Sequence, residues 1–338
     1  MSLRAQTEDL LPDLVVCASK ERVKGAGEDA FALQYSDSKH GTGYVAVFDG
    51  CGGMGAQKYA KAKNQSGARL ASNIAADIVD RFYAMPNGGF FLDGKDAERL
   101  EKELKKGLLT VKEAISEKSA FKIGGDLFRE LPTTMSLIVS KLGKDGNLYC
   151  EYLWAGDSRG FVLDQEGICQ ITEDDLESDE DAYSNLHNDA RLSNVVNADR
   201  AFTIHEKALK LENIISENGT KPTMLITATD GCFGYLRTPM HFQHLILNTL
   251  MRSTTEKAWE QSLIAELDKV AGDDCAITIA IYGCQDFETC KRQFTKLYGM
   301  HNTMYIKPLV NEEDESKAAA LWEKFKPSYY RKYVQKRR

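Results

Sequence analysis

Short apolar segments that border acidic residues constrain this chain more than any other feature. Four such segments, each with its acid, are residues 44–48 with Asp49, 148–155 with Asp157, 224–229 with Asp230, and 275–282, which follows Asp273 and Asp274. Short β-rich runs that each border a carboxylate allow a β scaffold to gather oxygen ligands at one edge. Magnesium and manganese prefer carboxylate, carbonyl and water ligands. The pattern therefore predicts a β scaffold that carries a metal-dependent hydrolytic site.

The composition is typical of an intracellular enzyme. The chain has 338 residues, of which 43% are hydrophobic, so it can bury a large core in one domain with or without an appendage. A formal charge of −7 argues against nucleic acid as a partner, and the eight cysteines show no metal-ligand spacing, which indicates reduced thiols. No apolar stretch approaches the ~20 residues that cross a bilayer, and no secretory apolar core opens the chain. We expect a monomer without a transmembrane segment, in the cytoplasm or the nucleus.

Periodic apolar positions predict helices between the strands. One pattern repeats every four residues through Leu70, Ile74, Ile78 and Phe82. The other helices that we predict are 96–118, 241–251 and 255–270, and the further strands are 14–19, 131–139 and 160–163, with a turn at 144–147. Strands flanked by pairs of amphipathic helices, without strict βαβ alternation, favour an α/β fold of the α+β layered-sandwich type.

Two regions lack this regular pattern. Residues 173–200 begin with an acidic run and have no period, so we expect an exposed loop or flap. We also predict a catalytic domain over residues 1–283 and a C-terminal helical extension over 284–338, with a helix at 312–326. Segment 327–338 is basic and contains no acid. We interpret it as a solvated tail, and the alternative is a patch that docks a partner or an anionic surface.

Six short motifs occur in a fixed order along the chain. They are Gly27-Glu28-Asp29-Ala30, Val47-Phe48-Asp49-Gly50-Cys51-Gly52-Gly53, Thr133-Thr134, Ala155-Gly156-Asp157-Ser158-Arg159, Ala228-Thr229-Asp230-Gly231 and Gly272-Asp273-Asp274-Cys275-Ala276. In this order the set resembles the metal-dependent serine/threonine protein phosphatases of the 2C type, from about residue 14 to residue 283. The resemblance implies two mostly antiparallel β-sheets flanked by pairs of α-helices, with a metal site at one edge.

The resemblance also implies which residues hold the metal. Asp49 would bridge two ions, and Gly50 would ligate one of them through its backbone carbonyl. Asp230 and Asp273 would hold the first ion. Asp157 matches the acid that helps to form a third, weaker site. The implied cofactors are two Mg or Mn ions, with a third bound less tightly.

Two further acids would act on the waters of this site. By position, Glu28 and Asp29 match residues that bind metal-bound waters, either as ligands or from outside the coordination sphere. Two cations about 3.5–4 Å apart can activate a bridging water and neutralise phosphoryl oxygens, so no protein nucleophile is needed. The resemblance thus implies hydrolysis of phosphoserine and phosphothreonine monoesters in phosphoproteins, and a role in signalling.

Several positions depart from the family's pattern. Lys24 stands where the family usually carries a phosphate-clamping arginine, and Arg22 lies two residues earlier. Lysine supplies charge without the bidentate fork of arginine, so substrate binding is expected to be looser. Cys51 stands where many eukaryotic members have a histidine, a proposed general acid, and bacterial members often have methionine. Asp274 replaces the usual asparagine, and the flap lacks the family's familiar sequence.

Three other interpretations compete with this one. Lys24, Cys51 and the altered flap would suit an inactive pseudophosphatase that acts as a binding or regulatory module, but the retained acids favour an active enzyme. The segment 50–55 matches the dinucleotide-binding pattern G-x-G-x-x-G, which requires an acid after a second strand ~20 residues on. Here that position is Asp77, inside a predicted helix. His241 and His244 are interpreted as packing residues and not as zinc ligands.

Overall fold

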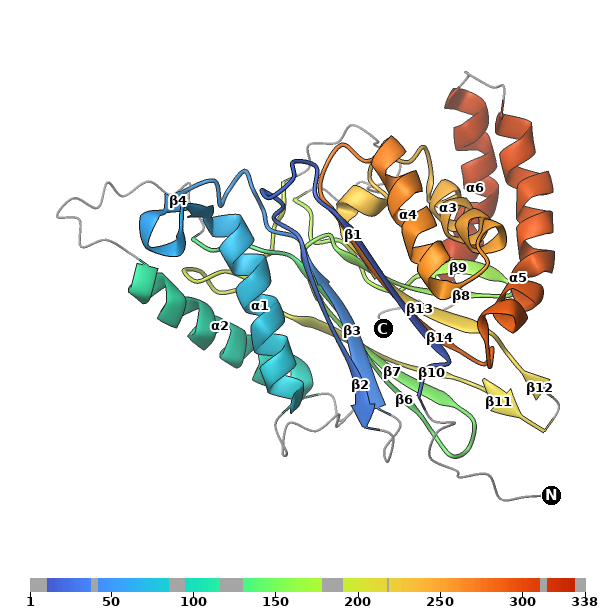
Figure 1. Cartoon of the computed structure of the whole chain (residues 1–338), viewed down its shortest axis with the longest axis horizontal. Helices are drawn as coiled ribbons and strands as arrows, with labels where there is room; N and C mark the ends of the chain where they lie inside the picture. Colours follow the sequence, from blue (N-terminus) through green and yellow to red (C-terminus); the bar gives the residue numbers. More distant parts are fainter. Residues whose placement is uncertain are drawn as a thin grey trace.

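Two antiparallel β-sheets packed face to face form the centre of the molecule (Figure 1). The computed structural model describes residues 11–37, 42–84, 95–115, 130–177, 191–217, 219–310 and 315–331. One sheet has the strand order β1-β14-β13-β8-β9 and the other has the order β10-β7-β6-β3-β2. Every strand pair in both sheets is antiparallel. The predicted layered sandwich of two sheets with flanking helices is confirmed.

The elements follow one another along the chain without strict alternation. The strands are β1 (Leu14–Lys20), β2 (Ala30–Asp37), β3 (Thr42–Phe48), β4 (Lys58–Tyr59), β5 (Gln65–Ser66), β6 (Met135–Leu142), β7 (Leu148–Ala155), β8 (Arg159–Asp164), β9 (Gly167–Gln170), β10 (His205–Leu211), β11 (Ile215–Ser216), β12 (Gly219–Thr220), β13 (Thr223–Ala228) and β14 (Cys275–Tyr282). The helices are α1 (Gly67–Ala84), α2 (Asp96–Ile115), α3 (Pro239–Arg252), α4 (Glu256–Val270), α5 (Phe287–His301) and α6 (Glu315–Arg331). Short helical turns are η2 (Ala60–Ala62), η3 (Asp230–Cys232), the π-helix η4 (Asn302–Ile306) and η5 (Lys307–Leu309).

The central strands are apolar on both faces because both faces are covered. On β13, Met224 and Ile226 belong to the core under the outer helices, whereas Leu225 belongs to the core between the two sheets. On β3, Tyr44 faces helices and Val45 faces the opposite sheet. Strands buried on both faces read as continuous apolar runs, because neither face tolerates a regular polar residue. This burial explains the apolar segments that the sequence shows.

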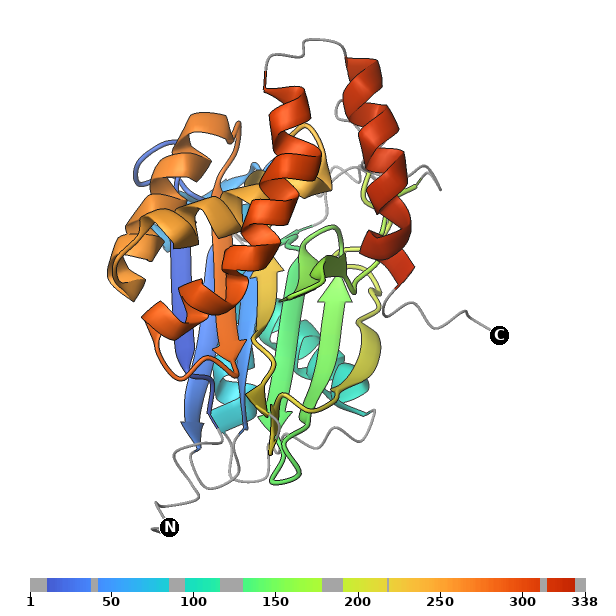
Figure 2. The same cartoon turned by 90° about the vertical axis from the view of Figure 1, so that its right-hand side faces the viewer.

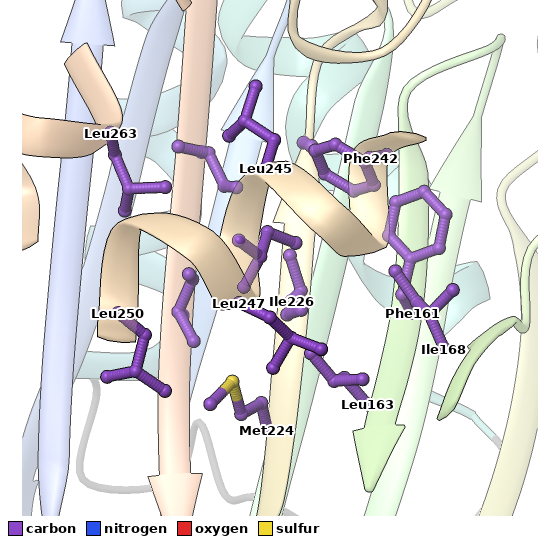
Figure 3. Close-up of a cluster of buried hydrophobic side chains, with 14 of the residues drawn as sticks. Phe161, Leu163, Ile168, Met224, Ile226, Phe242, Leu245, Leu247, Leu250 and Leu263 are labelled. Carbon is purple, nitrogen blue, oxygen red and sulfur yellow. The ribbon is translucent and has the colours of Figure 1, made fainter. Parts of the chain in front are cut away.

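Helices α3 and α4 cover the outer face of the β1-β14-β13-β8-β9 sheet. Figure 3 shows Leu247 of α3 and Leu263 of α4 in the same buried cluster as Ile226 of β13 and Phe161 of β8. The side chain of Trp259 is fully buried there, and its indole N–H donates to Thr249 Oγ1 at 3.0 Å. Full burial of each large apolar side chain contributes about 1.5–3 kcal/mol. Helices α3 and α4 therefore stabilise the β1-β14-β13-β8-β9 sheet, and Asp230 and Asp273 lie at the ends of its strands.

Helices α1 and α2 cover the other sheet in the same way. The predicted stripe of α1 was right in period, but the most deeply buried positions are Ala71, Ala75 and Val79, with Ile78 beside them. Small alanines let the helix lie close to the sheet. Leu100, Leu104 and Leu108 of α2 are fully buried against it, as their spacing predicts. Both predicted helices are confirmed, although α2 is described only to Ile115.

Some predicted boundaries were wrong. The strand predicted from residue 131 begins at Met135, because Leu131 has a positive φ of 54° and Thr133 makes only isolated bridges to Gly50 and Val196. The turn at 144–147 is confirmed, with Gly146 at φ 74°. Strands β2 and β10 and helix α5 were not predicted. Residues 191–200, in the predicted flap, form no helix or strand beyond isolated bridges, and residues 178–190 lie outside the described part.

The C-terminal helices pack on the same sheet layer as α3. Figure 2 shows α5 and α6 side by side, and α5 packs on α3 while α6 packs on β9 and α3. Their side chains Phe294, Trp322 and Tyr329 join the core under α3 and α4. The predicted helix at 312–326 continues through Pro327 to Arg331, and the basic residues from 332 on lie outside the described residues. The domain division at residue 283 stays a prediction.

Among the described residues, no helix combines the length and apolar character that crossing a membrane requires.

Candidate active site

The acids singled out in the sequence lie at one end of the sandwich. Asp49 follows β3, and Glu28 and Asp29 precede β2; the two strand ends are adjacent because Ala30 pairs with Phe48. The same holds in the other sheet, where Ala228 pairs with Arg159 and with Ile277. The acids that border these three strand ends, of β8, β13 and β14, are Asp157, Asp230, Asp273 and Asp274. Antiparallel pairing therefore brings together carboxylates from five separate segments.

Asp49 lies at the centre of this cluster. Burial raises its pKa well above the usual value, and the neighbouring acids Asp29, Asp230 and Asp157 raise it further. The pKa of Asp230 is also raised by burial. Like charges at close range disfavour ionisation of both groups. The crowding shows that the fold assembles negative charge at this point instead of spreading it.

Glu28 and Asp29 are each oriented by a hydroxyl group. Thr229 Oγ1 donates to Asp29 Oδ2 at 2.7 Å, and Ser66 Oγ donates to Glu28 Oε1. Burial nevertheless raises the pKa of Asp29 to about 8, with Asp230 adding to the rise. One oxygen of each carboxyl group is thus fixed by the protein.

Glycines make room for this cluster at two close approaches. A Cβ on Gly52 would come within 2.3 Å of Glu28 Oε2, so a side chain there would displace that carboxylate. A Cβ on Gly231 would lie 1.8 Å from the backbone oxygen of Asp274. The Asp230-Gly231 pair is therefore more than a turn, since Gly231 lets two acidic loops touch.

Asp157 is held in a buried loop between β7 and β8. The hydroxyl groups of Ser158 and Thr134 lie 2.6 Å apart, and Thr134 Oγ1 also accepts from the backbone N–H of Asp49 at 3.3 Å. Burial and Asp230 raise the pKa of Asp157. Its Oδ1 is buried without a hydrogen-bond partner in the described part of the chain. Buried polar atoms nearly always have partners, so an orphan oxygen beside other carboxylates fits a cation.

The donor set also fits a hard divalent cation, because every candidate ligand is an oxygen. Within the described ranges, however, no group of three or more histidine, cysteine, aspartate or glutamate side chains is arranged to hold a metal ion. The structure therefore shows the acids and their crowding.

Comparison with known proteins places the chain in a family. The sequence profile of protein phosphatase 2C matches residues 18–268. The chain belongs to the protein phosphatase 2C family. Comparison with curated proteins gives no match.

Solved phosphatases of bacteria share the fold at low sequence identity. The serine/threonine phosphatase Stp1 from Staphylococcus aureus is 16% identical with a TM-score of 0.52, over 79% of this chain and 93% of that one. PstP/Ppp from Mycobacterium tuberculosis is 15% identical with a TM-score of 0.51, over 79% of this chain and 97% of that one. PppA from Pseudomonas aeruginosa, described as a key regulatory component of T6SS, is 17% identical with a TM-score of 0.53, over 79% and 97%.

Positions that depart from the family's pattern lie at the rim of the cluster. Arg22 and Lys24 are exposed in the loop between β1 and β2. Asp274, in place of the usual asparagine, accepts the backbone N–H groups of Arg22 at 2.6 Å and Glu28 at 2.7 Å. Cys51 is half-buried, and its thiol lies 3.9 Å from the backbone oxygen of Asp49. The structure thus gives Asp274 a role in holding the loop.

The flap region is tied to the Asp157 loop by charged contacts. Arg159 forms a buried ion pair with Asp174. Asp175 accepts from the backbone N–H of Gly156 at 2.9 Å and pairs with His205 Nε2 at 2.8 Å. Segment 173–177 is therefore anchored, whatever the sequence of the flap beyond it.

Sequence reasoning missed the residues that orient the acids. Ser66 precedes α1 and accepts the backbone N–H of Arg69 at 3.2 Å, which is the geometry of a helix N-cap. A serine directly before an amphipathic helix is a signal that the sequence contains.

One cavity, of about 390 Å³, lies away from these acids. Residues of β9, α3, α5 and α6 line it, including Ile168, Met240, Leu297 and Phe325. The acid cluster therefore lies outside this cavity.

Proposed function

We propose that this protein is a magnesium- or manganese-dependent protein phosphatase that hydrolyses phosphoserine and phosphothreonine monoesters in phosphoproteins. The observation that carries the proposal is the crowding of carboxyl groups around Asp49, with the orphaned Oδ1 of Asp157 beside them. A divalent cation would relieve the mutual repulsion of these groups. Membership of the protein phosphatase 2C family supports the same chemistry.

By their positions, Asp49, the carbonyl group of Gly50, Asp230 and Asp273 would hold two cations, with Asp157 at a third and weaker site. When bound, two such cations supply a water activated for attack on phosphorus and neutralise the charge of the phosphoryl oxygens. No side chain of the protein then needs to act as a nucleophile.

The protein's own contribution is to hold waters and substrate in place. Glu28 and Asp29 each have one oxygen fixed by a hydroxyl group, Ser66 or Thr229, which leaves the other oxygen to accept a hydrogen bond from a water. Oriented acceptors of this kind hold a reacting water in line and reduce the entropy lost in the reaction.

Arg22 and Lys24 are proposed to bind the phosphoryl group. Both are exposed beside the acid cluster, and a cation attracts the phosphate dianion. If Lys24 replaces the family's arginine, Lys24→Ala will raise KM and Lys24→Arg will lower it, because a guanidinium adds a second parallel donor. If Arg22 does this work, Arg22→Ala will show the larger rise in KM.

The test of the proposal is metal-dependent turnover. Purified protein is assayed with p-nitrophenyl phosphate and with a phosphothreonine peptide, with manganese or magnesium added or with excess chelator. Activity with either metal and none in chelator is expected. For substitutions in the acid cluster, Asp164→Asn is the matched control, because Asp164 lies at the opposite end of β8 from the cluster. Full activity in chelator would reject the metal-dependent mechanism.

A pseudophosphatase that binds partners through the same site is the second candidate. Lys24 and Cys51 favour it, since each replaces a residue that the family uses in substrate binding or catalysis. Calorimetric binding of manganese without turnover of either substrate would support this candidate over the enzyme.

A further inference from the structure

The loop between β1 and β2 is fixed at both ends by one carboxylate. Asp274 Oδ1 accepts from Arg22 N at 2.6 Å, and its Oδ2 accepts from Glu28 N at 2.7 Å. A carboxylate that accepts two backbone N–H groups forms strong, charge-assisted hydrogen bonds. The loop therefore keeps a defined position beside Asp273, the neighbour of Asp274 in the chain.

Contacts from α1 hold the inside of the same loop. Arg69 Nη1 donates to the carbonyl oxygen of Gly25 at 2.5 Å, and its Nη2 lies 3.8 Å from Glu21 Oε1. Glu21 Oε2 in turn accepts the N–H of Gly25 at 2.6 Å. A Cβ on Gly27 would lie 2.4 Å from Glu21 Cγ, so the loop closes tightly over this side chain. The tip of the loop is thus preorganised, with Val23 61% exposed.

Tyr235 also lies beside the Asp273-Asp274 pair. It follows η3, where the N–H of Gly234 donates to Asp230 O at 2.6 Å. Its ring lies against Gly272, where a Cβ would come within 2.4 Å of the ring atom Cε1. The ring is nevertheless 51% exposed. Burial raises the pKa of Tyr235, Asp273 adds to the rise and Arg22 opposes it, so the phenol lies within electrostatic reach of both groups.

Two exposed side chains beside the Asp273-Asp274 pair, Val23 on the loop that Asp274 holds and Tyr235 against Gly272, suggest a recognition surface. Both side chains stand on backbone that is fixed by hydrogen bonds or close packing, so contact with a ligand costs little conformational entropy. A tyrosine ring offers a large, rigid contact area of this kind. Arg22 and Lys24 flank Val23 in the chain and complement the charge of a phosphoryl group.

We propose that Val23 and Tyr235 form a recognition rim that contacts the peptide chain next to the phosphorylated residue. The preferred substrates are then phosphoserine or phosphothreonine peptides with a large apolar residue directly beside the phosphorylated one. The inference rests on the proposed phosphatase function, which it deepens by naming the substrate class.

The test compares two phosphothreonine peptides that differ only in the residues flanking phosphothreonine, leucine in one and serine in the other. The readout is the ratio of kcat/KM for the two peptides, measured with manganese. Wild type is expected to prefer the leucine peptide by about tenfold, the size of one well-packed contact. Tyr235→Ala and Val23→Ser should each move this ratio toward one, through KM and not kcat, and Tyr235→Phe should keep it. Ile215→Ala is the matched control, because Ile215 is an exposed apolar residue in the separate hairpin β11–β12.

A ratio of kcat/KM near one in the wild type, or a ratio that Tyr235→Ala leaves unchanged, overturns the proposed recognition rim. Turnover of p-nitrophenyl phosphate in the same samples tests the proposed function separately, because that substrate has no peptide flank. If no substrate turns over, fluorescence anisotropy of the two labelled peptides decides the rim by itself. Binding of the leucine peptide that Tyr235→Ala weakens about tenfold supports it, and equal binding by both proteins overturns it.

Discussion

The acid cluster around Asp49 and the histidine cluster between α3 and α5 are both buried and titratable, yet they are built in opposite ways. In the histidine cluster, Thr238 Oγ1 lies 2.9 Å from His241 Nδ1 and 2.7 Å from the hydroxyl of Tyr305. His301 Nε2 donates to the carbonyl oxygen of Met240 at 2.9 Å, and the ring stacks on Tyr305. His241 and His301 are neutral and have partners.

The acid cluster lacks this balance. Its members carry the same charge, and burial together with that charge raises the pKa of Asp29 to about 8, whereas burial lowers the pKa of His241 and His301 to about 4. Like charges held together at a cost in stability mark a functional site, whereas buried groups with neutral partners stabilise a fold. Burial alone therefore does not identify a functional site. The partners of the buried groups do.

The largest expected effect is on turnover. Asp49→Asn or Asp230→Asn removes a charge from the proposed ligand set and should lower kcat/KM for p-nitrophenyl phosphate by more than about a hundredfold. His301→Gln should keep activity within a few-fold at temperatures where the protein is folded, as judged by circular dichroism. Equal losses in the acid and histidine variants would remove the distinction between the two clusters.

A substitution in the acid cluster that removes a charge should lower activity but raise the stability of the metal-free protein. The raised pKa of Asp29 means that the ionised group opposes folding, and this cost grows as pH rises from about 4, the unfolded value, to about 8. Asp29→Asn should therefore stabilise the protein in chelator at pH 7.5 by roughly 2–4 kcal/mol, and by little at pH 4. Urea unfolding curves measure this, with Asp164→Asn as the control. A loss of stability in Asp29→Asn at both pH values contradicts the expectation.

The histidine cluster should make the protein sensitive to acid. A histidine whose folded pKa is near 4 stays neutral in the fold, so its contribution is fully present above the unfolded value of about 6.5 and is lost as pH falls toward 4. At pH 5 each such histidine should cost about 2 kcal/mol relative to pH 7.5. Urea unfolding measures this effect. The free energy of unfolding should differ between pH 5 and pH 7.5 by about 2 kcal/mol less in His301→Gln than in the wild type. An unchanged difference would mean that His301 is solvated or paired at low pH.

The smallest expected effect concerns Cys51, which lies beside Asp49 but is not charged. A thiol is a weak hydrogen-bond donor, so we expect Cys51→Ser and Cys51→Met to keep kcat within about tenfold, below the 10²–10⁴ that a general acid contributes. The comparison of substrates is decisive, because an aryl phosphate leaves as a stable phenolate and a phosphothreonine peptide as a poor alkoxide. A loss of more than about a hundredfold by Cys51→Met on the peptide alone would make Cys51 the general acid.

Much of the fold could be predicted because its signals are local. The apolar runs that became β3, β7, β13 and β14 are continuous, since both faces of these strands are buried. Strand β10 was missed because it is an edge strand with alternating exposed positions and three charged residues, Glu206, Lys207 and Lys210. Helix α5 was missed although Asp286 caps it by accepting from Thr289 N. Its apolar positions are buried by packing on α3, and this contact is formed only in the folded protein.

By itself the sequence determined which acids border strands, because an apolar run followed by an acid is a property of neighbouring residues. The family motifs, in their order, also come from the sequence alone. Only the tertiary structure decided how these acids are oriented and what stands around them. Asp274 bonds to Arg22 across 252 positions of the chain, and Thr229 to Asp29 across 200. Such pairs depend on which strand ends become neighbours in antiparallel sheets, and no local pattern records that choice.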